Sequence, residues 1–330
     1  MKAVALPDKL RGTATAAEAA AAIGRGVRAA GWECDEVPVA DGGEGTLDVL
    51  GGPNRTTVVS GPLGDDVVAA WRYGRTAVIE MARASGLSLV GDDNDPVAAS
   101  TAGTGELIGA AVDAGCKRIV IGVGGSATTD GGLGAIRTLE PLTRLKGIEL
   151  IVACDVRTRF VDAARVFAPQ KGATPAQVEL LHRRLERLAQ LYEESYGVDV
   201  REVPGSGAAG GLAGGLLCAG AKLVAGFEAV ADELDLDERV EGADLVITAE
   251  GFLDEQSFEG KVVGGVHELA SANGVPVLAV VGEVLDGVAV PDGLRVVSLV
   301  GRYGVERARA ATAACIEEVV RDEVASSAWG

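Results

Sequence analysis

Short runs of β-branched and aliphatic residues alternate along this chain with longer segments in which apolar residues recur at helical spacing. The short runs predict buried strands, because β-branched side chains pack well on a pleated sheet. We expect strands at residues 2–6, 36–39, 76–81, 119–123, 149–153, 243–248, 275–281 and 295–299. Strands separated by helix-length segments indicate an α/β protein with parallel sheets and right-handed crossovers.

Two of the predicted helices carry a capping box at their start. Thr15 and Thr174 are each followed three residues later by Glu or Gln, which can return the hydrogen bond to the cap. The second helix has one apolar face, made by Val178, Leu181, Leu185, Leu188 and Tyr192. His182 falls outside that face, so we expect it to be solvated.

Composition and charge narrow the class of protein. The 330 residues suffice for two domains, and the 48% hydrophobic content with 24% charged residues indicates a globular chain. The net charge of −18 would repel nucleic acid and anionic lipid, so neither is an expected partner. An anionic substrate would need local lysine or arginine side chains, or a metal ion, to be held.

The cysteines and the N-terminus favour a cytoplasmic protein. The five cysteines are scattered, with no Cys-x-x-Cys pair, which favours reduced thiols over a disulfide framework or a zinc site. Pro7 interrupts the first apolar run, so no secretory signal is expected. The uncharged stretch 203–221 holds seven glycines and is too weakly apolar to span a bilayer.

A glycine-rich loop follows the predicted strand 119–123. Its glycines allow backbone N–H groups to approach an anion, and its hydroxyl groups add donors, as at Gly124, Gly125, Ser126 and Thr128. One carboxylate, Asp130, lies within this neutral segment and could serve as a base or a metal ligand. The pattern favours phosphoryl transfer, although a tight loop with glycines needed only for turn geometry is the alternative.

Charged residues also follow several other predicted strands, where ligands bind in open α/β sheets. Asp41 and Glu44 could hold Mg²⁺ and order a substrate hydroxyl, or one of them could cap the next helix. The other positions, for which solvated loop charges are the alternative, are Asp8, Lys9, Arg11, Asp155, Lys171, Glu250 and Asp254.

Generic nucleotide motifs are a poor match to the sequence. No Gly-x-x-x-x-Gly-Lys-Ser/Thr stretch occurs, which excludes a P-loop at the motif level. A loose dinucleotide pattern begins at Gly122, but a second copy begins at Gly24 inside a predicted helix. Further glycines interrupt the place where a pyrophosphate-binding helix should begin, which disfavours a Rossmann dehydrogenase.

Taken together, these segments resemble the bacterial glycerate 2-kinase family, and the matching blocks occur in family order over nearly the whole chain. They are Pro7-Asp8-(x)-(x)-Arg11-Gly12, Ala40-Asp41-Gly42-Gly43-Glu44-Gly45-Thr46, Gly103-Thr104-Gly105-Glu106, Gly122 to Gly132, Ala153-Cys154-Asp155-Val156, Phe167 to Ala173, Gly207 to Gly211, and Glu250-Gly251-(x)-(x)-Asp254-(x)-Gln256 with Gly260-Lys261. Departures from the family pattern include Lys9-Leu10-Arg11 in place of Ser-Phe-Lys and Phe252 in place of an arginine. These departures concern which acceptor is bound and which positively charged side chains contact phosphate.

The resemblance implies transfer of the γ-phosphate of ATP to a hydroxyl of D-glycerate, with Mg²⁺, giving 2-phosphoglycerate. It also implies two α/β domains, one flavodoxin- or Rossmann-like and formed from both chain ends, the other inserted. The change of character near Gly51 and the return to strand–helix alternation near Ala231 fit that plan, so we expect the first domain at residues 1–52 and 231–330 and the inserted one at 53–230. Glycerate is the expected small-molecule partner, and a homodimer is left open.

We hypothesise a division of roles among the candidate residues. The nucleotide phosphates would be held by Gly124, Gly125, Ser126 and Thr128, and Mg²⁺ by Asp155, Glu250 and Asp254. The acceptor carboxylate would be bound by Lys9 or Arg11, with Asp8, Glu44 and Lys171 as further substrate-binding candidates. The hydroxyl proton would be accepted by Asp41 or Asp130. Two alternatives are an NAD-dependent 2-hydroxy-acid dehydrogenase and a non-catalytic sugar-acid sensor. The missing DNA-binding segment and the acidic charge count against the sensor.

Overall fold

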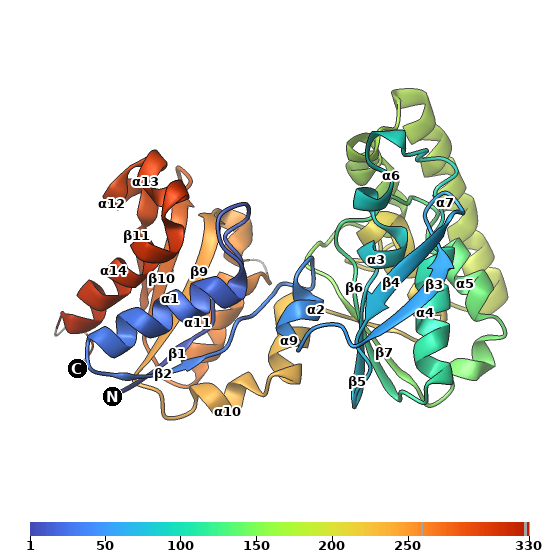
Figure 1. Cartoon of the computed structure of the whole chain (residues 1–330). Coiled ribbons are helices and arrows are strands. Elements are labelled where there is room, and N and C mark those ends of the chain that lie inside the picture. Colours follow the sequence, from blue (N-terminus) through green and yellow to red (C-terminus); the bar gives the residue numbers. More distant parts are fainter. Residues whose placement is uncertain (259, 327–328, 330) are drawn as a thin grey trace. The chain divides into compact units, whose positions relative to one another are not determined.

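The computed structural model describes residues 1–258, 260–326 and 329, and the chain forms two compact units. Unit 1 comprises Met1–Asp41 and Val230–Gly330, and unit 2 comprises Gly42–Ala229 (Figure 1). The sequence places the first boundary after residue 52, whereas the chain enters unit 2 at Gly42. The difference arises because Glu80 of unit 2 accepts hydrogen bonds from the N–H groups of Gly45 and Leu47, at 2.9 and 3.0 Å.

Unit 1 contains a five-stranded parallel sheet with the order β11-β10-β9-β1-β2. In chain order within the unit this is the 2-1-3-4-5 arrangement of flavodoxin-like folds, so the predicted α/β class with parallel sheets is confirmed. The strands are β1 (Lys2–Ala5), β2 (Glu33–Glu36), β9 (Leu245–Leu253), β10 (Val277–Val284) and β11 (Leu294–Ser298).

Helices cover both faces of this sheet. Side chains from alternate positions of β1, β9 and β10 form a core with α1 (Ala16–Ala29) and α14 (Thr312–Ala325). The intervening positions face the other way, as successive strand residues must, and α11 (Val262–Ala272) contacts β9 and β10. The remaining helices are α10 (Leu236–Val240), α12 (Leu299–Tyr303), α13 (Val305–Ala310) and α9 (Gly226–Glu233), which spans the second unit boundary.

Unit 2 has a four-stranded parallel sheet, in the order β5-β6-β7-β8, and a separate antiparallel hairpin of β3 and β4. The sheet strands are β5 (Thr76–Glu80), β6 (Arg118–Gly122), β7 (Glu149–Ala153) and β8 (Lys222–Val224); the hairpin strands are β3 (Arg55–Ser60) and β4 (Asp66–Trp71). The two hairpin strands and β8 are absent from the strands predicted above. β3 is rich in polar residues and half of its positions are exposed, so it lacks the apolar run that marks a buried strand. β4 does carry an apolar run, residues 67–71, with Ala69 and Trp71 buried, and is nevertheless absent from the prediction.

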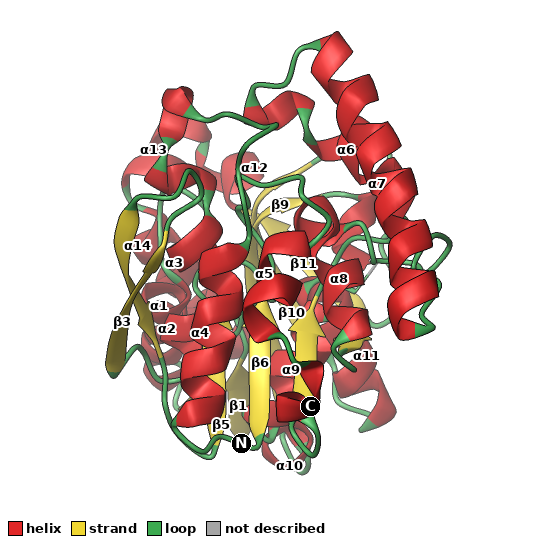
Figure 2. Cartoon of the chain, turned by 90° about the vertical axis from the view of Figure 1, so that its right-hand side faces the viewer, coloured by secondary structure: helices red, strands yellow, loops and turns green. Residues whose placement is uncertain are grey.

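One face of the unit 2 sheet packs against α4 (Ala102–Asp113), α5 (Leu133–Leu139) and α8 (Leu212–Cys218) (Figure 2). The long helix α7 (Pro175–Tyr196) instead forms a second core with α6 (Ala163–Phe167) and the 3₁₀ turn η4 (Phe160–Asp162). Two short helices complete the unit, α2 (Thr46–Val49) and α3 (Ala82–Ser85).

The structure confirms both predicted capping boxes, at Thr15 and Thr174. The solvated state predicted for His182 is wrong: the residue is 9% exposed, and its Nδ1 lies 2.7 Å from the carbonyl oxygen of Val161. The reason is that η4 covers this side of α7 next to the apolar face. Likewise, β2 ends at Glu36 instead of beginning there, although the N–H of Val37 still donates to the carbonyl of Ala5.

Candidate functional site

The carboxyl ends of β1 and β9 form the topological switch point of the unit 1 sheet. In flavodoxin-like folds the crevice at this point is where ligands bind, because the crossovers on its two sides go to opposite faces of the sheet. Asp8 and Lys9 follow β1 directly, and the N–H of Asp8 donates to the carbonyl of Ala249 in β9, at 2.9 Å. The backbone thus fixes Asp8 at the switch point.

Lys9 lies between two carboxylates in unit 1. Its Nζ is 3.7 Å from Oδ1 of Asp8 and 3.8 Å from Oδ1 of Asp41. The Asp8 side chain is 8% exposed, whereas that of Asp41 is 25% exposed. Burial raises the pKa of Asp8 to about 6, with the neighbouring charge of Asp41 adding to this and Lys9 opposing it. Arg11 lies in the next turn and is exposed.

Glu250 stands on the adjacent strand, because β9 continues to Leu253 instead of ending at Thr248 as predicted. Burial raises the pKa of Glu250 to about 7; Ser257 and Lys261 oppose this shift, and the negative charges of Asp8 and Asp254 add to it. Its Oε2 atom is buried and has no hydrogen-bond partner in the described part of the chain. An ionised carboxylate in this position needs a cation beside it, since a buried unpaired charge is costly.

Asp254 extends the acidic cluster beyond the end of β9. Its Oδ1 accepts a 2.8 Å hydrogen bond from the N–H of Ser257 and lies 3.9 Å from Nζ of Lys261. Asp8, Lys9, Arg11, Asp41, Glu250 and Asp254 therefore all belong to unit 1, and we call Asp8, Lys9, Asp41, Glu250 and Asp254 the switch-point cluster.

The glycine-rich loop lies in unit 2 and follows β6. Lys171, which ends the 3₁₀ turn η5 (Pro169–Lys171), donates from Nζ to Oγ of Ser126 at 2.8 Å and to the carbonyl of Thr128. Burial lowers the pKa of Lys171 to about 7, and the charge of Asp130 acts in the opposite direction. Lys171 is therefore a buried side chain that links two residues of the loop, Ser126 and Thr128.

A second segment approaches the same loop. A Cβ atom added at Gly124 would lie 3.0 Å from Cα of Gly43, and one added at Gly122 would lie 2.5 Å from the carbonyl oxygen of Gly42. The segment that carries Glu44 therefore passes along the end of β6, which explains the glycines at these positions. Glu44 itself is exposed.

Asp130 has a structural surrounding that the sequence does not reveal. One oxygen accepts from the N–H and Oγ1 of Thr101, at 2.9 and 2.8 Å, and from the N–H of Gly134 at 3.1 Å. The other accepts from the N–H of Gly132, at 3.1 Å. These donors lie at the starts of α4 and α5, so Asp130 caps two helices.

Asp155 likewise meets a helix start, because its Oδ1 accepts a 2.8 Å hydrogen bond from the N–H of Gly226 at the beginning of α9. The three predicted metal ligands are thus divided: Asp155 belongs to unit 2, and Glu250 and Asp254 belong to unit 1. Among the residues that the structure describes, no three Asp, Glu, His or Cys side chains are already gathered as metal ligands.

Sequence reasoning missed two further parts of unit 2. Asn94 donates from Nδ2 to the carbonyls of Ala127 and Lys171, at 3.2 and 2.9 Å, and so joins the glycine-rich loop to η5. Arg137 and Arg184 line a pocket beside Asp130. The only sequence signal for the arginines is their place on the polar sides of two amphipathic helices, which most surface arginines share.

Comparison with known proteins identifies the family of the chain. The model of the glycerate kinase family matches residues 3–141 and 136–324. Glycerate 2-kinase of Escherichia coli (strain K12) is 40% identical, over 88% of this chain and 87% of that protein. Glycerate kinase of Bacillus subtilis (strain 168) is also 40% identical, over 86% of this chain and 85% of that protein.

A crystal structure assigned to glycerate kinase 2 of Salmonella typhimurium LT2 superposes with a TM-score of 0.85 at 35% identity, covering 99% of this chain and 98% of that one. The matches define an enzyme of the phosphotransferase class. The chain belongs to the glycerate kinase family. As a kinase it takes a nucleotide as phosphoryl donor and a small molecule as acceptor, and the dehydrogenase and sensor alternatives find no support.

None of the helices in the described part of the chain combines the length and the apolar composition that a membrane span requires.

Proposed function

We propose that this chain transfers the γ-phosphate of ATP to a hydroxyl of D-glycerate in the cytoplasm, giving 2-phosphoglycerate. The observation that carries the proposal is the switch-point cluster, in which Lys9 and four carboxylates gather at the carboxyl ends of β1 and β9 in a chain of this family. Phosphoryl transfer needs cations to neutralise developing charge and a carboxylate to orient the attacking hydroxyl.

We assign the proton-accepting role to Asp41. It is the more exposed of the two carboxylates beside Lys9, so a substrate hydroxyl can reach it. Asp8 is more buried and keeps Lys9 in place, and the lysine would bind the acceptor carboxylate together with Arg11. Asp130 is the less suitable base, because four hydrogen bonds already occupy both of its oxygens.

The switch-point cluster fits a magnesium ion. Mg²⁺ prefers oxygen ligands and is usually held by one or two carboxylates plus substrate phosphates. Glu250, whose buried Oε2 has no partner in the described residues, and Asp254 would hold it. When bound, the ion supplies neutralisation of the charge that develops on the transferred group. Asp155 is the weaker candidate because it caps α9.

We assign nucleotide phosphates to the glycine-rich loop. Gly125 has a φ of +70°, a conformation that glycine adopts without strain. Within the described residues, no hydrogen bond takes up the backbone N–H groups of Gly124, Gly125 or Ser126. Such N–H groups form anion-binding concavities, and a phosphate bound there would favour the protonated form of Lys171, which contacts Ser126 and Thr128.

The test is ATP consumption by the full chain with a panel of 2-hydroxy acids, with and without Mg²⁺. We expect Mg²⁺-dependent ADP release with D-glycerate, and ³¹P NMR of the product should show a phosphate ester at the C2 oxygen. A change in NADH absorbance without ATP, or glycerate binding without ATP consumption, would contradict the proposal.

A further inference from the structure

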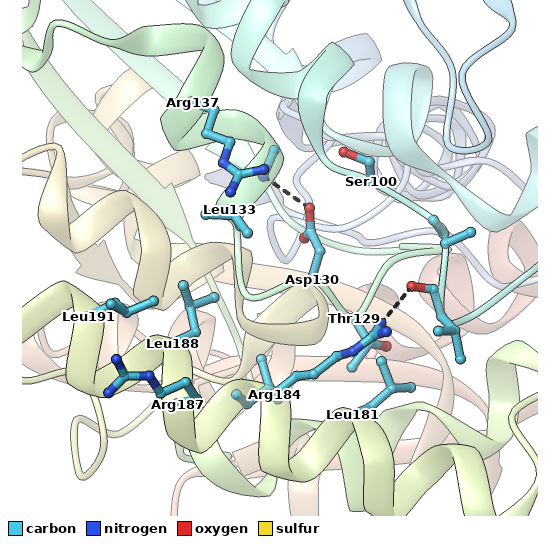
Figure 3. A pocket seen from close by; sticks show the side chains of 15 residues that line it. Ser100, Thr129, Asp130, Leu133, Arg137, Leu181, Arg184, Arg187, Leu188 and Leu191 are labelled. Atoms are coloured by element: carbon cyan, nitrogen blue, oxygen red, sulfur yellow. Dashed lines mark hydrogen bonds between the residues drawn. The ribbon is translucent and has the colours of Figure 1, made fainter.

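A pocket of about 410 Å³ opens beside the glycine-rich loop, entirely within unit 2 (Figure 3). Its size falls in the range of small-molecule sites, roughly 300–1,000 Å³. One side is apolar and is made by Leu133, Leu181, Leu185 and Leu188. Because Thr129 lines the pocket and follows Thr128 in the chain, the pocket wall and the proposed phosphate loop are one continuous segment.

Three arginines line this pocket, although the whole chain carries a net charge of −18. Arg137, Arg184 and Arg187 are all exposed, and Arg184 donates a 3.0 Å hydrogen bond from Nη1 to the carbonyl of Val97. A guanidinium group matches phosphate oxygens with two parallel N–H donors. The pocket therefore offers positive charge beside an apolar wall, which suits a ligand with an anionic part and an apolar part.

A buried hydroxyl group in the pocket wall points to a ligand independently of the charge. Thr129 is 2% exposed, and its Oγ1 has no hydrogen-bond partner in the described part of the chain. Buried polar atoms are nearly always paired, so an orphaned one is a marker of a missing partner. Asp130 also lines the pocket, but its carboxylate is already satisfied by backbone and hydroxyl donors.

We propose that this pocket binds the nucleoside part of a nucleoside triphosphate, whose phosphates pair with Arg137 and Arg184 and extend to the glycine-rich loop next to the pocket wall. The proposal rests on the proposed function, since it locates the phosphoryl donor of that reaction. The leucine wall contacts the flat base, and Oγ1 of Thr129 hydrogen-bonds to the nucleoside. A small sugar acid has no apolar face with which to cover four leucine side chains, so the acceptor does not suit this pocket.

The experiment measures dissociation constants of ATP, adenosine and inorganic triphosphate for the full chain, by calorimetry, in the absence of glycerate. Arg184→Gln should weaken ATP and triphosphate about 10-fold and leave adenosine unchanged, since a hydrogen bond to a charged group is lost. Thr129→Val should weaken ATP and adenosine about 5-fold and leave triphosphate unchanged. Ala98→Trp, which adds bulk at an exposed position of the pocket lining, should weaken ATP and adenosine more than about 10-fold, since the pocket is partly filled.

The matched control is Arg183→Gln, an exposed neighbour on α7 that does not line the pocket. Thermal unfolding of each variant shows that the fold is kept. Equal ATP affinity in all four variants, with glycerate still phosphorylated by the unchanged chain, would overturn the pocket assignment and leave the proposed function standing. Pocket-dependent ATP binding without any glycerate phosphorylation would overturn the proposed function alone.

Discussion

The candidate functional groups of unit 1 are ionisable side chains, whereas those of unit 2 are mainly backbone and hydroxyl groups. The switch-point cluster places Lys9 between Asp8 and Asp41, with Glu250 on the next strand. The unit 2 loop offers glycine N–H groups, with Lys171 buried behind them. Under the proposed roles, a proton and a metal ion would be handled by groups that can change charge, and a phosphate chain by groups whose geometry is fixed.

The largest expected effect is on turnover, from Asp41→Asn. The amide cannot accept the hydroxyl proton, and general-base catalysis contributes roughly 10²–10⁴-fold, so we expect kcat to fall at least about 100-fold. Steady-state kinetics with saturating ATP and glycerate measures this. The control is Asp286→Asn, an exposed residue of unit 1, which should behave as the unchanged chain. Full activity in Asp41→Asn would remove Asp41 from the chemistry.

Asp130→Ala tests the unit 2 part of this comparison. Here we expect a loss of stability and not primarily a loss of turnover. The change leaves the N–H groups of Thr101 and Gly134 without their acceptor, and Thr101 is fully buried. Unfolding in urea should show a loss on the order of 3 kcal/mol, since unsatisfied buried donors cost about 1–3 kcal/mol each. If Asp130→Asn kept full stability and lost turnover, Asp130 and not Asp41 would be the base.

Lys171→Met should change how stability depends on pH. The pKa of Lys171 is about 7 in the folded chain and near its ordinary 10.5 in the unfolded chain. Between these two pKa values the unfolded chain binds more protons than the folded chain, so Lys171 makes the free energy of unfolding rise with pH. The free energy of unfolding that is lost by burying Lys171 is therefore greatest below pH 7, where the buried amine is protonated. From pH 6.5 to 9 the unchanged chain should gain about 2 kcal/mol relative to Lys171→Met. Parallel urea-unfolding curves across that range would show that Lys171 keeps its ordinary pKa.

The smallest effect is expected from a pair of glycine changes in unit 2. Gly125→Ala should lose about 1 kcal/mol, because a side chain at a φ of +70° is strained. Gly109→Ala should gain up to about 1 kcal/mol, because Gly109 lies within α4 and nothing lies within 4 Å of the position that a Cβ would take. Thermal unfolding compares the two. A higher unfolding temperature in both variants would mean that the loop adopts another conformation and is not a rigid phosphate-binding loop.

Much of the fold could be predicted from the sequence, because its strands are continuous apolar runs and its helices carry local caps. Thr15 and Thr174 form the capping boxes that their spacing predicts. Glu80 shows the limit: within a fully buried strand it is 3% exposed and pairs with Arg83, and its role is to accept hydrogen bonds from the start of α2. That partner lies far away in sequence, and no local pattern encodes it.

The same limit explains why the candidate site was predicted only in outline. Residues that follow parallel strands could be listed, but their hydrogen bonds depend on segments from elsewhere in the chain. Asp130 reads as a base within a glycine loop, and only the fold shows Thr101 beside it. Thr129 gives no signal in sequence at all, since an unpaired hydroxyl group is visible only once burial is known.

The two ends of unit 2 lie against each other: a methyl group added at Gly42 would sit 3.0 Å from Cα of Gly226. A module whose entry and exit coincide can be inserted into a host by opening a single connection, here the one between β2 and β9. Unit 1 still completes its own five-stranded sheet from both ends of the chain. Residues 42–229 are therefore a natural unit to transplant, and the host could be closed across the gap with a short linker.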